Sequence, residues 1–250
     1  MNKIPPEIRF DRLRRMVGLQ GLETLRNAVV TVVGIGAVGS FAVEALARSA
    51  VGHLRLVDFD IVCPSNINRQ LIALESTLNR KKTEVIRERV LDINPDCVAE
   101  TLDLCVDSTH TAPVFETRSD VILDAIDLLP GKTALIAEAV RRGIPLVSSM
   151  GAARRQDPTL IRTAALPHVT GCPLARALRR GLKKAEIPMD SIECVYSIEP
   201  PVPSRTENTS APDASLSPKA PLPSSVMVTG CFGLNLAHLA IRKILTSQNG

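Results

Sequence analysis

The chain has 250 residues, of which 45% are hydrophobic and 22% charged, the composition of a globular protein that can bury one core. Its apolar runs are far shorter than the roughly 20 residues that span a bilayer, and its first residues lack the apolar stretch of a secretion signal. We therefore expect a cytoplasmic protein with no membrane contact. The formal net charge is only +4 and aromatic residues make up 2%, which argues against an aromatic platform for single-stranded bases.

Short apolar runs alternate with amphipathic stretches between residues 28 and 149. The apolar runs predict strands at 28–33, 53–57, 98–106, 120–126 and 144–149, and the amphipathic stretches predict helices at 37–50, 80–93 and 131–142. Such an alternation is typical of an α/β fold with a Rossmann-like, mostly parallel sheet that helices cover on both faces.

The composition changes towards both ends of the chain. We expect an N-terminal helical arm over 1–27, a Rossmann-like core over 28–151 and a C-terminal extension over 152–250, together forming one compact domain. The extension is predicted to contain strands at 160–166 and 193–197, a basic helix at 173–185, a mobile loop rich in proline and serine at 199–225, and a closing helix at 226–245.

The first predicted strand runs into a G-x-G-x-x-G motif formed by Gly34, Gly36 and Gly39. In this motif the first glycine permits a tight turn, the second lets a phosphate approach the backbone, and the third allows close packing of the following helix. Glycines also form plain strand-to-helix turns, so the motif alone is a weak signal. Asp58 strengthens it, because a carboxylate at the end of the next strand is where a ribose is bound. We therefore predict a nucleotide site.

Positively charged residues after the second strand indicate which nucleotide is bound. A triphosphate needs cations that neutralise it, whereas a dinucleotide needs few beyond the glycine loop. Arg69 and Lys82 follow Asp58 and supply positive charge where ATP would need it. Arg80 and Lys81, by contrast, are interpreted as solvated residues in the first turn of a helix.

Two carboxylates stand at the end of the fourth predicted strand, in the run from Ile122 to Asp127. Open α/β sheets bind ligands at the carboxyl ends of their strands. Asp127 is placed to hold Mg²⁺ there, whereas Asp124 is interpreted as a cap of the next loop. For an aspartate at a strand end, capping is otherwise about as common as metal binding. We predict a site for ATP and Mg²⁺.

Several segments, in the order in which they follow one another along the chain, resemble those of the ThiF-type, ubiquitin-activating-like adenylyltransferases. The resemblance covers about residues 9 to 151 and rests on Arg9-Phe10-Asp11-Arg12, the glycine motif, Leu56-Val57-Asp58-Phe59-Asp60, Ser65-Asn66-Ile67-Asn68-Arg69-Gln70, Lys82 and Asp124-Ala125-Ile126-Asp127. It implies that Asp58 and Asp60 hold the ribose. It also implies the remaining ligands of the nucleotide, namely Asn66, Arg69 and Lys82 for the phosphates and Asp127 for Mg²⁺. Finally, it implies a homodimer in which Arg12 or Arg15 reaches the γ-phosphate in the partner's site.

Downstream segments resemble one branch of this family, the tRNA threonylcarbamoyladenosine dehydratases. They are Ser148-Ser149-Met150-Gly151-Ala152, Gln156-Asp157-Pro158-Thr159, Cys172-Pro173-Leu174-Ala175-Arg176 and the run from Val195 to Pro201. Such enzymes use ATP to adenylate the carboxylate of the threonylcarbamoyl group on N6-threonylcarbamoyladenosine beside the tRNA anticodon, and ring closure expels AMP. The resemblance implies this activity, a tRNA substrate, and a possible sulfur-acceptor or persulfide-relay partner.

Three positions depart from the pattern of the family. Cys172 stands where an acidic residue is expected before Pro-Leu-Ala, and Leu128 follows Asp127 where many adenylyltransferases have asparagine. Arg154 and Arg155 replace small residues. The departures at Cys172 and Leu128 leave the architecture intact but bear on the local geometry of the site.

The predicted helix at 173–185 carries five cations and no acidic residue, namely Arg176, Arg179, Arg180, Lys183 and Lys184. Their spacing of three and four residues puts most of them on one side of the helix, where they can follow the phosphates of a tRNA. The alternative is a solvated helix face with no ligand, and we weigh the two equally.

Three other functions are open on these residues. A sulfur-carrier adenylyltransferase would share the ATP site, but such relatives commonly carry two C-x-x-C pairs for zinc, which this sequence lacks. A nicotinamide-dependent oxidoreductase would explain the glycine motif and leave Arg69 and Lys82 without a role, and no lost residue favours a non-catalytic nucleotide-binding adaptor. The six cysteines are scattered, and we expect Cys194 and Cys231 to be buried, inert thiols.

Overall fold

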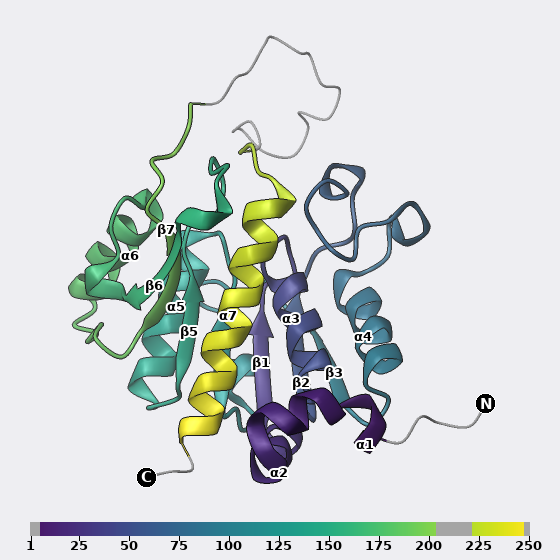
Figure 1. Ribbon diagram of the computed structural model, residues 1–250. Helices are drawn as coiled ribbons and strands as arrows, with labels where there is room; N and C mark the ends of the chain where they lie inside the picture. Colours follow the sequence, from purple (N-terminus) through teal and green to yellow (C-terminus); the bar gives the residue numbers. More distant parts are fainter. Residues whose placement is uncertain (1–5, 204–221, 248–250) are drawn as a thin grey trace.

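The computed structural model describes residues 6–203 and 222–247 of the chain (Figure 1). Its helices are α1 (Pro6–Arg9), α2 (Asp11–Asn27), α3 (Gly39–Arg48), α4 (Lys82–Ile93), α5 (Leu129–Arg141), α6 (Pro173–Lys184) and α7 (Val226–Thr246). Its strands are β1 (Val29–Val33), β2 (His53–Asp58), β3 (Val98–Asp103), β4 (Val121–Asp124), β5 (Leu146–Ser149), β6 (Ile161–Ala165) and β7 (Glu193–Ser197).

The strands form one seven-stranded sheet in the order β3-β2-β1-β4-β5-β7-β6. Neighbouring strands are parallel except for β6, which runs antiparallel to β7. The predicted α/β fold with a mostly parallel sheet is therefore confirmed. Strands β2 and β3 lie in succession on one side of β1, and the next strand, β4, lies on the other side of β1. In sheets of this kind, ligands bind at the carboxyl ends of the strands where the order reverses, here between β1 and β4.

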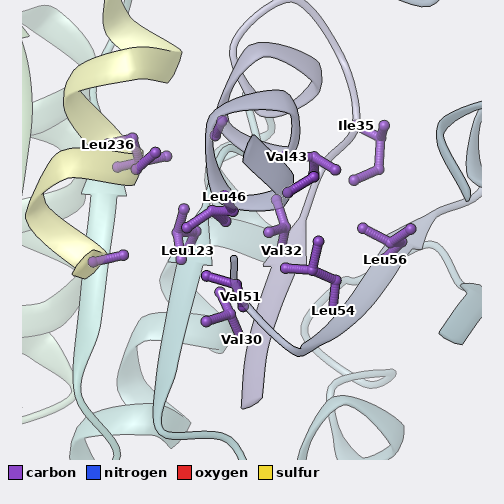
Figure 2. Packing of buried hydrophobic residues seen from close by; sticks show 14 of the residues in the cluster. Val30, Val32, Ile35, Val43, Leu46, Val51, Leu54, Leu56, Leu123 and Leu236 are labelled. Carbon is purple, nitrogen blue, oxygen red and sulfur yellow. The ribbon is translucent and has the colours of Figure 1, made fainter. Parts of the chain in front are cut away.

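Both faces of the sheet are buried, which is why the central strands β1 and β4 are mostly apolar. Val32 faces the core that α3 and α7 cover, where Leu46 and Leu236 also lie (Figure 2). The next residue, Val33, faces the opposite side and belongs to the core beneath α5 and α6, together with Leu135. Each fully buried aliphatic side chain contributes roughly 1.5–3 kcal/mol, and the two cores hold the carboxyl edge of the sheet in place.

The C-terminal extension continues the same sheet through β7 and β6, while α7 crosses the front face and packs against α3 (Figure 1). The predicted mobile loop at 199–225 falls mostly on residues 204–221, which lie outside the described residues. Its described ends are held by Arg154, whose amide donates to the carbonyl oxygen of Pro223 at 2.8 Å and whose carbonyl oxygen accepts from the amide of Val202 at 2.9 Å. In the described parts of the chain, no helix is long and apolar enough to cross a membrane.

Two strands end earlier than the sequence predicts. β3 ends at Asp103, whose side chain accepts a hydrogen bond from the hydroxyl of Thr83 at 2.9 Å, and β4 ends at Asp124. Both aspartates bond to groups outside their own strands, and their side chains thereby favour a turn over a longer strand. The predicted helix at 37–50 begins only at Gly39, because the chain first completes the turn through Gly34.

Candidate active site

The loop between β1 and α3 holds the three glycines at the point where the strand order reverses. Gly34 has a φ of 91°, and a Cβ there would lie 2.8 Å from the carbonyl oxygen of Ala125. A Cβ at Gly39 would lie 1.8 Å from the carbonyl oxygen of Gly34, so both positions exclude a side chain. At Gly36 a Cβ would meet only the amide nitrogen of Gln70, 3.9 Å away. The space over Gly36 is therefore open, and no side chain caps the start of α3.

Asp58 joins the end of β2 to the glycine loop. Its Oδ2 accepts a hydrogen bond from the amide of Ile35 at 2.6 Å, and its Oδ1 accepts one from the amide of Asp60 at 2.9 Å. Burial raises the pKa of Asp58 above its ordinary value, although the charge of Lys82 and the two amides oppose that shift. Each oxygen retains a second lone pair, so the carboxylate can also accept from the hydroxyls of a ribose.

Lys82, the first residue of α4, is buried beside the end of β2. Its Nζ lies 2.7 Å from Oδ2 of Asp60, so two residues that the family resemblance places at the nucleotide meet in one ion pair. The neighbouring Arg80 and Lys81 form ion pairs with other carboxylates at the surface, as expected of solvated residues. Of the three consecutive cations, only Lys82 is directed towards the site.

The segment after β2 crosses over to the glycine loop and carries Asn66 and Arg69. Asn66 is buried, and its Oδ1 accepts a hydrogen bond from the amide of Cys63 at 3.2 Å, which shapes the turn. Arg69 is half-buried, and its Nη1 donates to the carbonyl oxygen of Ser65 at 2.5 Å and to Oδ1 of Asn68 at 3.0 Å. The guanidinium is thus folded back on its own loop, and a phosphate would have to replace these acceptors.

Gln70 is a polar residue of the site to which the sequence analysis gave no role. Its side chain is buried, its amide nitrogen faces the open space over Gly36, and its Oε1 lacks a hydrogen-bond partner among the described residues. A buried amide oxygen without a partner is unfavourable unless a ligand or water completes it. The signal in the sequence was its place at the end of the segment from Ser65 to Gln70, next to Arg69.

The loop after β4 carries the predicted Mg²⁺ ligand. Asp124 is buried, and its Oδ1 accepts a hydrogen bond from the amide of Ile126 at 3.1 Å, in agreement with the predicted capping role. Its Oδ2 lies 2.5 Å from Nζ of Lys132, a residue that the sequence analysis did not identify. Asp127 is exposed, and within the described chain its carboxylate has no hydrogen bond or ion pair.

This donor set suits a magnesium ion that shares its coordination with phosphates. In the described residues, no three His, Cys, Asp or Glu side chains gather as a metal cluster. Mg²⁺ in nucleotide sites is usually bound through one or two carboxylates, with phosphate oxygens and waters completing the octahedron. Asp127, an unpaired carboxylate in the loop that packs against Gly34, fits this pattern.

Arg12 and Arg15 lie far from this site within their own chain. Both are on α2, at the edge where β1 begins, whereas the glycine loop follows the opposite end of β1 (Figure 1). Arg15 is paired with Asp11 through a 2.7 Å contact, and Arg12 is exposed. The role that the family resemblance implies for these arginines therefore requires a second copy of the chain.

Helix α6 separates its five cations into two groups. Arg176, Arg180, Lys183 and Lys184 are exposed and form no ion pair with any residue that the structure describes. Arg179 is half-buried, and its Nη1 donates to the carbonyl oxygens of Leu166 at 3.0 Å and Val169 at 2.8 Å. It thereby fastens α6 to the preceding turn.

Two of the family departures meet at the start of α6. The thiol of Cys172 caps this helix by accepting from the amide of Ala175 at 3.5 Å. Arg155 is 3% exposed and donates through Nη2 to the carbonyl oxygen of Gly171 at 3.0 Å, while its Nε and Nη1 are buried without a described partner. Burial lowers the pKa of Arg155, and the nearby Cys172 and Glu199 act in the opposite direction.

The two cysteines expected to be inert differ from each other. Cys194 is buried, as predicted, and burial raises the pKa of its thiol to about 12. Cys231 is half-buried on α7, so the prediction of a buried thiol is wrong there. The reason is that α7 packs through one side, and Cys231 lies on the other side with the exposed Met227, Leu234 and His238.

Comparison with known proteins identifies the family. The model of the ThiF family matches residues 10–249. A tRNA threonylcarbamoyladenosine dehydratase of Bacillus subtilis is 41% identical over 193 residues, which are 77% of this chain and 76% of that protein. That of Haemophilus influenzae is 36% identical over 97% of this chain and 95% of its own length. The chain belongs to the ThiF family and, within it, to the tRNA threonylcarbamoyladenosine dehydratases.

The fold agrees with this assignment over the whole chain. A crystal structure of the Escherichia coli tRNA N6-threonylcarbamoyladenosine dehydratase in complex with AMP has a TM-score of 0.88, with 33% identity, and covers 100% of this chain and 99% of its own. A second structure of that enzyme is a complex with ATP and has a TM-score of 0.87. The C-terminal extension is thus part of the shared fold.

Proposed function

We propose that this chain is an ATP-dependent tRNA threonylcarbamoyladenosine dehydratase. It adenylates the carboxylate of the threonylcarbamoyl group on N6-threonylcarbamoyladenosine, beside the anticodon, and the group then cyclises. The observation that carries the proposal is the open space over Gly36 at the strand reversal, flanked by Asp58 and by the loop of Asp127, in a chain whose full length matches dehydratases. A cytoplasmic location, where tRNA is present, is part of this proposal.

The chemistry needs positioning and charge stabilisation and requires no protein nucleophile. A carboxylate resists nucleophilic attack until one of its oxygens attacks the α-phosphorus of ATP and pyrophosphate leaves. The tethered carbamoyl group then attacks the activated carbonyl and loses a proton, and AMP departs with the oxygen that attacked the phosphorus, while the other oxygen stays as the carbonyl of the new ring. Because this second step is intramolecular, its high effective concentration replaces an enzyme nucleophile. The protein therefore has to hold the triphosphate and neutralise the charge that moves onto pyrophosphate.

Each site residue receives a role that its position supports. The carboxylate of Asp58 binds the ribose, with Asp60 beside it, and the amides at the start of α3 face the phosphates. The phosphates are contacted by Asn66, Arg69 and Lys82. Asp127 holds Mg²⁺, which would offset negative charge on the phosphate oxygens when bound. Arg69 first exchanges its two loop acceptors for phosphate oxygens, so the loop tightens around the nucleotide.

The exposed face of α6 is the surface that we assign to tRNA. Arg176, Arg180, Lys183 and Lys184 stand at helical spacings of three to four residues and have no carboxylate partner among the described residues. Unpaired cations in a row can replace the counterions of a phosphate backbone. A sulfur-acceptor or persulfide-relay protein stays a candidate partner on the family resemblance alone.

We also propose a homodimer in which α2 brings Arg12 or Arg15 to the partner's γ-phosphate. The apolar side chains of Met16 and Leu19 on the same helix are 80% and 65% exposed, which supports contact of α2 with another surface. Mixing an inactive R12A/R15A chain with an inactive D127A chain tests this. In a mixed dimer the R12A/R15A chain keeps its own Asp127 and receives the arginines of the D127A chain, so one of the two sites is complete. About a quarter of wild-type activity is expected after subunit exchange. Absence of any recovery, with exchange verified by mass, would contradict the shared site.

The central experiment measures pyrophosphate and AMP release from ATP. The purified chain is supplied with tRNA that carries N6-threonylcarbamoyladenosine, with the same tRNA lacking the modification, or with a sulfur-carrier protein. Release that depends on the modified tRNA, together with its cyclised nucleoside in the digest, is the expected result. Release stimulated by the carrier protein alone would replace the proposal with the sulfur-carrier alternative. Tight binding of a nicotinamide dinucleotide without binding of ATP would overturn both.

A further inference from the structure

Lys132 on α5 is a fully buried cation outside the groups that contact the nucleotide in our proposal. Its side chain is 0% exposed, and its Nζ lies 2.5 Å from Oδ2 of Asp124. The same nitrogen donates to Oγ of Ser148 at 3.2 Å and to the carbonyl oxygen of Ser149 at 2.9 Å. All three N–H groups of the ammonium thus have an acceptor, and the hydroxyl of Ser148 donates to Asp124 at 2.6 Å.

This network ties together three elements around one loop. Asp124 ends β4, Ser148 and Ser149 end β5, and Lys132 lies in the first turn of α5. Between Asp124 and α5 lies the loop of residues 125–128, which contains Asp127. The loop is fixed at its start as well, because the amide of Ala125 donates to the carbonyl oxygen of Val33 at 2.8 Å.

The network reaches the backbone next to Asp127 directly. While Oδ2 of Asp124 binds Lys132, its Oδ1 accepts the amide of Ile126 at 3.1 Å. The orientation of the Asp124 carboxylate therefore sets the backbone of Ile126, one residue before Asp127. A rotation of this carboxylate would release both contacts together.

Stability alone does not explain a buried Lys–Asp pair. Desolvation of two charges offsets most of their attraction, and a pair of apolar side chains of similar volume is often as stable or more stable. What the ion pair adds is direction, because hydrogen bonds fix an orientation that apolar contacts do not. Groups that orient a ligand through such contacts commonly change metal affinity when they are altered.

We propose that Lys132 is a positioning residue that, through Asp124, holds the loop of Asp127 in the orientation needed to bind Mg²⁺ with ATP. This inference rests on the proposed function, because it needs the Mg²⁺ role of Asp127. Lys132 is too deeply buried to touch the nucleotide and acts only through Asp124.

The test separates loop orientation from fold stability. In Lys132→Met the carboxylate of Asp124 is left buried and unpaired, so the melting temperature should fall steeply. In the double variant K132M/D124N the unpaired charge is gone, while the amide oxygen of residue 124 can still accept the amide of Ile126. The melting temperature of this variant should recover most of the loss.

The decisive measurement is calorimetric affinity for ATP with and without Mg²⁺. For K132M/D124N we expect the gain in affinity from Mg²⁺ to fall by about tenfold or more, as in Asp127→Ala, while affinity without Mg²⁺ stays near that of the wild type. A double variant with the melting temperature and the Mg²⁺ gain of the wild type would overturn the inference. Equal loss of affinity with and without Mg²⁺ would also overturn it, since that result indicates collapse of the whole pocket.

Two further variants complete the test. Ser148→Ala keeps the ion pair between Lys132 and Asp124 but removes the bond from the hydroxyl of residue 148 to Asp124. It should lower the gain in ATP affinity from Mg²⁺ by a smaller factor, with little change in melting temperature. An unchanged gain would contradict the inference even if the double variant fails to fold. E44Q/R89M removes a surface ion pair with a 2.6 Å contact and should leave the gain unchanged. If wild-type protein binds no ATP at all, the proposed function fails first.

Discussion

The cations beside the proposed nucleotide site, here called the nucleotide edge, have different surroundings from those of the segment that follows β5. Two cations of the nucleotide edge, Lys82 and Lys132, are buried and each is paired with a carboxylate, Asp60 or Asp124, whereas Arg69 forms no described ion pair. In the later segment, Arg155 is buried with Nε and Nη1 lacking a described partner, and the four exposed cations of α6 form no ion pair with the described residues. Paired cations orient loops, whereas unpaired exposed cations are available to a polyanion.

The largest effect is expected from removing the unpaired charges of the nucleotide edge. Arg69→Ala and Asp127→Ala should each lower AMP formation by about 10³-fold or more, because both groups act on charge that develops in the transition state. Circular dichroism and melting temperature should stay close to the wild type, since Asp127 is exposed and Arg69 binds only its own loop. Near-normal AMP release from a folded variant would refute the role of that residue.

The salt dependence of tRNA binding tests the role that we propose for the exposed face of α6. Each single replacement of Arg176, Arg180 or Lys183 by alanine should flatten the slope of log affinity for tRNA against log salt by about one unit. Arg179→Ala is the matched control, because it removes a cation from the same helix that is bonded to two carbonyl oxygens. It should lower the melting temperature and leave the slope nearly unchanged. A slope that responds only to Arg179 would reverse our assignment of the two groups.

A smaller effect is expected at Arg155, the buried cation whose Nε and Nη1 have no described partner. Arg155→Met removes a buried charge whose Nε and Nη1 lack described acceptors and keeps an apolar stem, but it also removes the Nη2 bond to Gly171. The free energy of unfolding should therefore stay within about 1 kcal/mol of the wild type. Urea denaturation measures this, with the exposed Arg162→Met as a control. A loss of about 3 kcal/mol or more would exceed what the single bond to Gly171 supplies and would show that ordered water or another group completes the guanidinium.

The smallest effect on activity is expected from the cysteines. Burial raises the pKa of Cys97 to about 11 and that of Cys194 to about 12, so both thiols should resist alkylation at pH 8 in the folded protein. Cys105 is exposed and should be labelled first, as peptide mass spectrometry can establish. A variant with all six cysteines replaced by serine or alanine should keep its rate of AMP formation. A lost rate in a folded variant would contradict a mechanism based on charge alone.

The elements that sequence reasoning predicted well are those with a local cause. The turn at Gly34 and the close packing at Gly39 were expected from the spacing of the motif, and the structure leaves no room for a Cβ at either position. Arg179 was grouped with the four exposed cations of α6 because helical spacing alone does not say which cation meets the carbonyl oxygens of Leu166 and Val169. Lys132 was missed because one lysine in a helical pattern looks like a surface residue.

The sequence by itself determined the succession of strands and helices along the chain, the glycine turn and the family of the chain. Each of these depends on residues that are close together in the sequence, through hydrophobic periodicity, the left-handed backbone at a glycine and the spacing of motifs. Only the tertiary structure decided which charges are paired. Lys132 meets Asp124, Ser148 and Ser149 because β4, β5 and α5 converge at one edge of the sheet, and no local pattern encodes that convergence.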